Sequence, residues 1–215
     1  MGQGGKTAQL VLMLSIIGGV SYLLTWSIYL EPALSTVWKG AGVMLLALSA
    51  AMQARNLDGW LLALVMAFGA AGDVLLEIAG FTAGGAAFAA GHVVAIALYL
   101  RNRRDALTLS QRFLAVLVIP VTVFAAFTLP ADRAAAPAVA VYALLLSAMA
   151  AAAWTSRFPR FRAGIGAMMF VASDLLIFAR MGPLGDTVSV GVAVWLLYYF
   201  GQLLIMMGVR EGLDR

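Results

Sequence analysis

The chain of 215 residues is 63% hydrophobic and 11% charged, and its sequence contains no cysteine. Because soluble domains are about 25% charged, this composition and a mean hydropathy of +0.97 indicate an integral membrane protein. The lack of thiols excludes disulfides, thiolate metal sites and a cysteine nucleophile. A net charge of +4 does not indicate a nucleic-acid partner, since the basic residues lie in loops between apolar runs.

Apolar runs of about 20 residues, the length that crosses a bilayer as a helix, occur eight times in the sequence. They predict an all-α protein whose residues 1–215 form a single eight-helix transmembrane domain. Breakers separate several runs, at Glu31-Pro32, Gly80 to Gly85, Pro130 and Gly182-Pro183. The expected helices are Ala8 to Tyr29, Ala33 to Met52, Trp60 to Ile78, Gly84 to Leu100, Arg112 to Leu129, Ala135 to Trp154, Gly164 to Met181, and Val188 to Val209.

The basic residues are divided unevenly between the two sets of connections. Arg133 and Arg180 lie on one side, and Lys39 lies inside the second apolar run. The positive-inside rule places the richer side, and with it both termini, in the cytoplasm. In a bacterium, this membrane would be the inner, or plasma, membrane. The cytoplasmic basic residues are Lys6, Arg55, Arg101, Arg103, Arg104, Arg112, Arg157, Arg160, Arg162, Arg210 and Arg215.

Two of the apolar runs carry carboxylates. Asp73 and Glu77 in the third run are four residues apart and share a helix face. Asp174 lies in the seventh run. An ionisable group in hydrocarbon costs about 2.5 kcal/mol or more, and usually marks a site, a water path or a buried pair. The two runs are also similar, which predicts a 4+4 parallel internal repeat.

Other polar groups lie at comparable depths. By helix rise, Lys39 and His92, the only histidine, fall in the same middle and outer-leaflet half of the membrane as Asp73 and Asp174. Convergence of these four groups on one cavity is the economical interpretation, because lone charges facing lipid are hard to support. The eighth run adds a polar-aromatic stripe at helical spacing that suits a pocket wall: Trp195, Tyr198, Tyr199 and Gln202.

Each of these residues also has a structural interpretation. Asp73 and Asp174 could form buried ion pairs with Lys39, which would then hold the acids rather than contact a substrate. Glu77 could be a solvated helix end, and His92 a hydrogen-bonded core residue. The stripe on the last run is also typical of helix packing. Gly72 and Ser173 would allow close approach of helices.

Several membrane chemistries do not fit the sequence. Ala70 stands where an intramembrane aspartyl protease requires glycine, and no Gly-x-Ser-Gly element of a rhomboid-like protease occurs. A single histidine is too few for a ceramidase-type zinc hydrolase. No phosphate-binding glycine loop or dinucleotide fingerprint is present. No metal site is predicted from these residues.

A reaction performed by a pair of carboxylates in a pocket without bulk water fits the sequence better than these chemistries. Two such groups can divide acid and base duties when their environments differ. Glycosidases use this logic through an oxocarbenium-like transition state. A vinyl ether suits it as well, because protonation at carbon gives an oxocarbenium ion, water adds, and the hemiacetal collapses to an aldehyde. Which of Asp73 and Asp174 would be the acid stays open at this point.

The sequence resembles the lysoplasmalogenase (YhhN-like) family of membrane proteins from about Ala33 to Gly208. The resemblance rests on the order and spacing of Lys39, Gly72-Asp73, Phe81/Gly84/Phe88/His92/Tyr99, Phe170 with Ser173-Asp174, and Trp195-Tyr198-Tyr199-Gln202.

That resemblance implies an eight-helix enzyme that hydrolyses the alkenyl ether of a lysoplasmalogen to a fatty aldehyde and a glycerophospho-head group, without an organic cofactor. Its substrate and partners would be a single-chain ether lysophospholipid and the bilayer. Asp73 and Asp174 become the catalytic candidates. The substrate-binding candidates are Lys39, Glu77, His92, Ser173, Trp195, Tyr198, Tyr199 and Gln202.

Two rival functions stay open. A small-solute or proton-coupled transporter would use Asp73, Asp174 and Lys39 as a relay, and a parallel repeat would support it. The sequence lacks the pronounced Gly/Pro interruptions typical of transporter sites. The other rival is a noncatalytic lipid-binding protein, in which binding would survive the loss of either aspartate.

Overall fold

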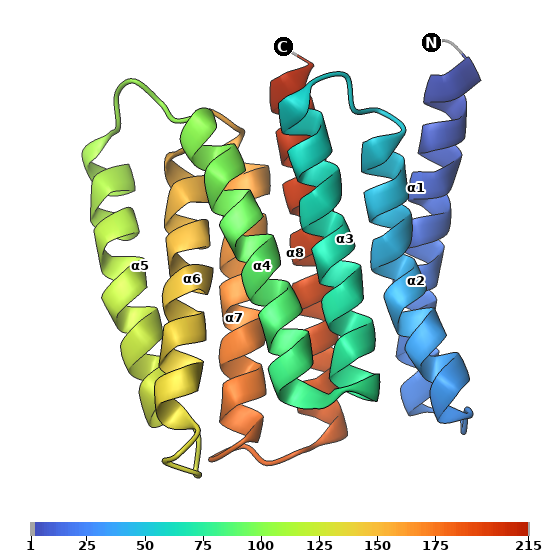
Figure 1. The fold of residues 1–215 in the computed structure, drawn as a ribbon, viewed down its shortest axis with the longest axis vertical. Helices are drawn as coiled ribbons and strands as arrows, with labels where there is room; N and C mark the ends of the chain where they lie inside the picture. The colour runs from blue at the N-terminus through green and yellow to red at the C-terminus, as the bar shows by residue number, and fades with distance from the viewer. Residues whose placement is uncertain (1–2, 215) are drawn as a thin grey trace. The chain divides into compact units, whose positions relative to one another are not determined.

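The structure is a computed structural model that describes residues 3–214, so that Arg215, counted above among the cytoplasmic basic residues, lies outside it. The described residues form an all-helical protein in which eight helices are long and apolar enough to span a membrane, as the sequence predicted (Figure 1). These helices are α1 (Gln3–Ser21), α2 (Pro32–Ala51), α3 (Leu57–Ile78), α4 (Gly80–Arg101), α5 (Leu109–Thr128), α6 (Ala136–Thr155), α7 (Ile165–Arg180) and α8 (Val188–Leu213).

The ends of the first and seventh helices differ in winding from the expectation. The first span does not continue as an α-helix to Tyr29, because Tyr22–Trp26 tightens into a 3₁₀ segment. The hydroxyl of Thr25 donates a hydrogen bond to the backbone oxygen of Tyr22 at 2.7 Å within this segment. A π-helical turn, Arg160–Gly164, leads into α7. The eight helices were therefore predicted correctly in number and type, and their ends less well.

The expected interruption from Gly80 to Gly85 is wrong for most of its length. Only Ala79 separates α3 from α4, and Gly80, the first residue of α4, has a left-handed φ of +83° that favours glycine. Gly84 lies inside α4, where an added Cβ would collide with Leu76 of α3. This glycine therefore allows two helices to approach closely, and the run continues as a helix because turn and packing glycines look alike in sequence.

The chain divides into two compact units, one ending at Leu98 and the other beginning at Tyr99. The first contains α1 to α3 and nearly all of α4, and the second contains α5 to α8. The single-domain organisation, the 4+4 repeat and the cytoplasmic location of the termini stay predictions.

In the first unit, α2 packs against both α1 and α3 (Figure 1). Two buried serine hydroxyls donate hydrogen bonds to backbone oxygens across the α1–α2 interface, Ser15 to Gly42 at 2.6 Å and Ser49 to Ala8 at 2.9 Å. In apolar surroundings such bonds replace the water that these groups would otherwise bind. They fix α2, which carries Lys39, against its neighbour.

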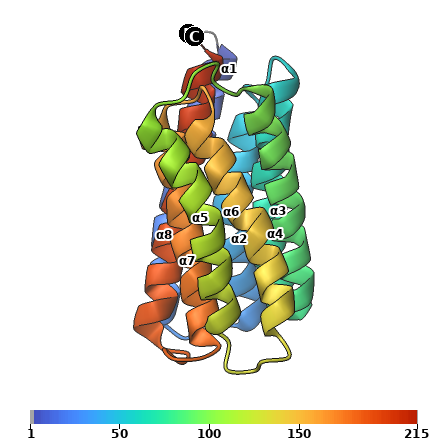
Figure 2. The ribbon, with the colours of Figure 1, turned by 90° about the vertical axis from the view of Figure 1, so that its left-hand side faces the viewer.

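In the second unit, α5 lies along α6 and also contacts α7, while α7 packs along α8 (Figure 2). The α7–α8 contact is close because Gly166 faces Gly201, and a Cβ added to Gly166 would lie 2.5 Å from the backbone oxygen of Gly201. Small residues at such crossings bring helix backbones together. This contact sets the positions of the polar side chains that α7 and α8 carry.

Candidate functional site

The two aspartates predicted to be catalytic are both deeply buried inside their own units. The exposed fraction of Asp73 on α3 is 2%, and that of Asp174 on α7 is 5%. Neither lies at a helix end, so neither is a solvated terminal residue. A buried carboxylate needs partners that replace water, and the two units supply different ones.

Asp174 accepts a hydrogen bond from the phenol of Tyr142, with 2.6 Å between the Tyr142 hydroxyl oxygen and Asp174 Oδ2. Tyr142 comes from α6 and is partly buried. Sequence reasoning missed this residue. Its one available signal was a phenolic hydroxyl in an Ala- and Leu-rich helix that otherwise offers few polar groups, and the periodicity of α6 gives no reason to pair it with α7.

The ring of Tyr142 is held by packing. It meets Phe178 edge to face, with 5.9 Å between the ring centroids and an interplanar angle of 86°. Both rings belong to an apolar cluster with Ala126, Val139 and Ala143. Phe178 and Asp174 are four residues apart on α7 and share a helix face. One tyrosine therefore contacts an apolar residue and a carboxylate on the same side of α7.

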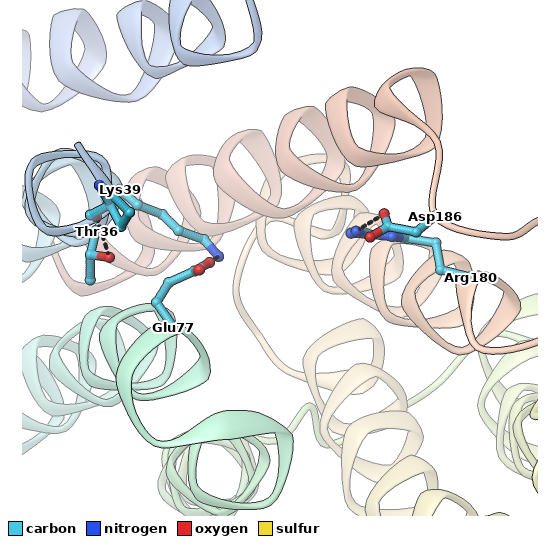
Figure 3. A network of polar contacts seen from close by, with 6 residues as sticks. Thr36, Lys39, Glu77, Arg180 and Asp186 are labelled. Atoms are coloured by element: carbon cyan, nitrogen blue, oxygen red, sulfur yellow. Dashed lines mark hydrogen bonds and ion pairs between the residues drawn. The ribbon is translucent and has the colours of Figure 1, made fainter. Parts of the chain in front are cut away.

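In the first unit, Lys39 forms an ion pair with Glu77, with 2.7 Å between Lys39 Nζ and Glu77 Oε1 (Figure 3). The Lys39 side chain is 16% exposed and that of Glu77 is 45% exposed. The structure thus gives Glu77 a partner, and it is more than a solvated helix end. The negative charges of Asp73 and Glu77 both attract the ammonium of Lys39.

His92 on α4 is 3% exposed. It follows Gly91, whose missing side chain brings α4 against Phe68 of α3. Likewise, a Cβ on Gly72 would lie 2.7 Å from the ring of Phe88, which confirms the expectation that Gly72 allows close helix approach. The role of His92 in binding a substrate stays a prediction.

The polar-aromatic stripe on α8 is buried at the interface with α7. Trp195 stacks on Tyr199, with ring centroids 5.8 Å apart, and Tyr198 meets Phe170 of α7 edge to face. The hydroxyl of Ser173 donates a hydrogen bond to the backbone oxygen of Val194 at 3.0 Å. Packing thus accounts for much of this stripe, as its structural interpretation expected.

Gln202 differs from the rest of the stripe. Its side chain is 2% exposed, and its Oε1 has no hydrogen-bond partner among the described residues. Buried polar atoms are nearly always hydrogen-bonded, so a buried acceptor without a protein donor calls for a water or a ligand. Of the expected substrate-binding residues, Gln202 is therefore the one whose buried acceptor oxygen requires a hydrogen bond from a bound water or substrate.

The described residues hold no group of three or more His, Asp or Glu side chains placed to bind a metal ion. The second unit also contains an ion pair, Arg180 with Asp186, in the connection between α7 and α8 (Figure 3). This pair is exposed at Asp186 and lies outside the predicted site residues.

The structure brings the predicted residues together in two groups. Lys39 and Glu77 pair in the first unit, near the charge of Asp73. Asp174 lies with Tyr142 in the second, where Ser173 and the α8 aromatics line the adjoining α7–α8 interface. The convergence of both aspartates on one cavity stays a prediction.

Eight apolar helices with buried carboxylates define a polytopic integral membrane protein whose interior carries ionisable groups. The chain belongs to the YhhN family, the lysoplasmalogenase family, whose family profile matches residues 34–209. This membership suggests a hydrolase. No curated protein and no solved structure matches the chain.

Proposed function

We propose that this protein hydrolyses the alkenyl ether bond of a lysoplasmalogen, releasing a fatty aldehyde and a glycerophospho-head group. The observation that carries the proposal is the burial of Asp73 and Asp174 within apolar helices of a chain that belongs to the lysoplasmalogenase family. Buried carboxylates in spanning segments are costly to keep. They are retained where they perform chemistry or bind a charged group.

The proposed chemistry divides acid and base duties between the two aspartates. One carboxylic acid delivers its proton to the alkenyl carbon remote from the ether oxygen, which turns the ether into an oxocarbenium ion. The other carboxylate takes a proton from water as the water oxygen bonds to the cationic carbon. The hemiacetal then collapses: its hydroxyl proton returns to the first aspartate, the carbon–oxygen bond to glycerol breaks, and the glycerol oxygen takes a proton from the second. Both aspartates end as they began.

Substrate binding follows from the remaining candidates. The ammonium of Lys39 carries the positive charge that would attract the phosphate of the head group, and Glu77 would hold it in position. Gln202 Oε1, which has no partner among the described residues, would accept a hydrogen bond from a glycerol hydroxyl or from the attacking water. His92, Ser173, Trp195, Tyr198 and Tyr199 would complete the pocket.

A substrate panel tests this reaction class. The purified protein in detergent would be given three choline lysolipids of equal chain length: the 1-alkenyl ether, the saturated 1-alkyl ether and the 1-acyl ester. The proposed mechanism needs a carbon–carbon double bond to protonate, so aldehyde should form from the alkenyl lipid alone. Cleavage of the saturated ether or of the ester would contradict carbon protonation.

The ethanolamine alkenyl lipid, run beside the choline lipid, reports the head-group preference. A folded protein that cleaves neither alkenyl lipid would exclude the proposed function. Flux measurements in liposomes would then test the transporter reading, in which the same carboxylates relay protons.

A further inference from the structure

The two buried aspartates have partners of different charge, and this difference separates their roles. We propose that Asp174 carries the proton and is the acid of the pair, with Tyr142 as the residue that positions it, whereas Asp73 is the ionised carboxylate. The catalytic roles in this inference rest on the proposed hydrolase function. The location of the proton can be tested without any activity.

The partners occupy matching places in the two units. Lys39 is the eighth residue of α2 and precedes Asp73 by 34 residues, and Tyr142 is the seventh residue of α6 and precedes Asp174 by 32 residues. Each acid thus has a polar residue near the start of the helix that precedes its own. In one unit that residue is a cation, and in the other it is a neutral phenol.

The first partner favours an ionised Asp73. Asp73 lies one helical turn before Glu77 on the same face of α3, and Glu77 forms the 2.7 Å ion pair with Lys39. The ammonium therefore lies on the side of α3 that carries Asp73, and the two interact electrostatically. A fixed positive charge close to a carboxylate offsets the cost of removing the carboxylate's negative charge from water. Two acidic residues one turn apart thus share the face of α3 that Lys39 of α2 contacts.

Tyr142, the partner of Asp174, is neutral and cannot compensate the negative charge of an ionised carboxylate. The described hydrogen bond of Asp174 comes from the Tyr142 hydroxyl, and no ion pair among the described residues involves this aspartate. Asp174 is 5% exposed, and Tyr142 joins it to an apolar cluster. An isolated negative charge in such surroundings is far more costly than a neutral acid. The carboxyl of Asp174 is therefore neutral.

The geometry then selects the oxygen that carries the proton. Oδ2 is 2.6 Å from the Tyr142 hydroxyl oxygen. Oδ2 therefore acts as the carbonyl-type acceptor, and the proton resides on Oδ1. Because the Tyr142 ring is fixed against Phe178, its hydroxyl fixes the plane of the carboxyl group and the direction in which Oδ1–H points. Tyr142 acts through Asp174 and is a positioning residue.

In the proposed reaction, Oδ1 of Asp174 gives its proton to the alkenyl carbon, and the electron pair of the double bond forms the new carbon–hydrogen bond. Asp73 accepts a proton from water while the water oxygen adds to the oxocarbenium carbon. On collapse of the hemiacetal, Asp174 recovers a proton from the hemiacetal hydroxyl, and Asp73 gives its proton to the departing glycerol oxygen. No oxidant or reductant is required.

Infrared spectroscopy of the purified protein in neutral buffer tests the proton's location directly. The carbonyl stretch of a neutral carboxylic acid is separate from the bands of ionised carboxylates. The wild type should show this stretch, Asp174→Asn should lose it, and Asp73→Asn should keep it. In Tyr142→Phe the band should persist but shift to higher frequency, because Oδ2 no longer accepts a hydrogen bond. The exposed Asp132→Asn variant is the control and should leave the band unchanged.

A missing wild-type band, a band that survives in Asp174→Asn, or a band lost in Asp73→Asn would overturn the assignment. If Asp174→Asn does not fold, Tyr142→Phe decides the question, because a phenylalanine keeps the ring packing. An unshifted band in that variant would contradict the role of Tyr142. These outcomes do not depend on whether the protein cleaves a lipid.

Kinetics then separates positioning from stability. Tyr142→Phe should lower kcat about 10-fold or more, which corresponds to losing a hydrogen bond worth about 1.4 kcal/mol to a reacting group, with KM changed less than about 2-fold. Ser147→Ala is a matched control, since it removes another buried hydroxyl from α6 whose hydrogen bonds go to that helix's own backbone. An equal loss in both variants, or none in Tyr142→Phe, would contradict the inference. An inactive wild type would instead overturn the proposed function.

Discussion

Lys39 and Glu77 form an ion pair between α2 and α3, with 2.7 Å between Nζ and Oε1, in a chain whose helices otherwise contain few charges. The pair is uneven in burial, since the lysine side chain is 16% exposed and the glutamate side chain 45% exposed. Lys39 is also attracted by the more deeply buried Asp73. The lysine is therefore the member on which the local balance of charge depends.

Removing Glu77 should affect stability little. Exposed ion pairs contribute about 0–1 kcal/mol because solvent screens them, so Glu77→Gln should lower the Tm by no more than a few degrees. Lys39→Met should be more damaging, because it leaves two negative groups without their cation. Thermal unfolding in detergent, followed by tryptophan fluorescence, compares the two variants. A larger loss in Glu77→Gln would contradict this ranking.

Lys39→Met also bears on substrate binding. If the ammonium binds the phosphate of the lysolipid, this variant should raise KM about 10-fold or more, the cost expected for losing a charge-assisted hydrogen bond. Lys39→Arg keeps the charge and should recover part of the affinity. Steady-state kinetics on the alkenyl lipid provides the measurement, and unchanged KM in Lys39→Met would remove the lysine from the substrate pocket.

Close packing of α7 and α8 should be sensitive to one methyl group. A Cβ at Gly166 would lie 2.5 Å from the backbone oxygen of Gly201, which cannot move aside as a side chain can. Gly166→Ala should therefore destabilise the protein by about 1–3 kcal/mol. Gly85→Ala in α4 is the control, since its added Cβ meets nothing within 4 Å. Equal melting temperatures for both variants would show that α7 and α8 can move apart at Gly166 without loss of stability, which would contradict the prediction.

Gln202 should be more important for the reaction than for the fold. Its buried Oε1 has no partner among the described residues, so Gln202→Leu should leave the melting temperature unchanged or raise it slightly. If a glycerol hydroxyl or the attacking water donates to this oxygen, the variant should lose activity about 10-fold or more. Activity equal to that of the wild type would return Gln202 to a packing role.

The sequence predicted what depends on apolar patterning, and missed what depends on contacts between helices. Runs of about 20 apolar residues identify the eight spans, and a carboxylate inside such a run is conspicuous, so Asp73 and Asp174 were found. Tyr142 was missed because a lone tyrosine in an apolar helix carries no signal of the carboxylate it faces. From the sequence, Lys39 was expected to pair with the aspartates, whereas its hydrogen bond goes to Glu77.

Glycines show the same limit. Gly80 to Gly85 looked like one loop, but Gly80 has a positive φ while Gly84 lets α3 and α4 touch. In the sequence, both kinds of glycine appear only as a residue without a side chain. A glycine needed for a positive φ therefore cannot be distinguished from one needed for close contact between helices. The meeting of Asp73 and Asp174 in one cavity stays a prediction because it depends on how the two units join.

The catalytic role of the two buried aspartates is tested most simply by aldehyde release from a 1-alkenyl lysophospholipid. The wild type, Asp73→Asn and Asp174→Asn are compared, each monodisperse in detergent, with Asp132→Asn as the exposed control. The wild type and Asp132→Asn should release aldehyde, and both buried variants should lose about 100-fold or more of this activity. A folded Asp73→Asn or Asp174→Asn variant with wild-type turnover would contradict that role.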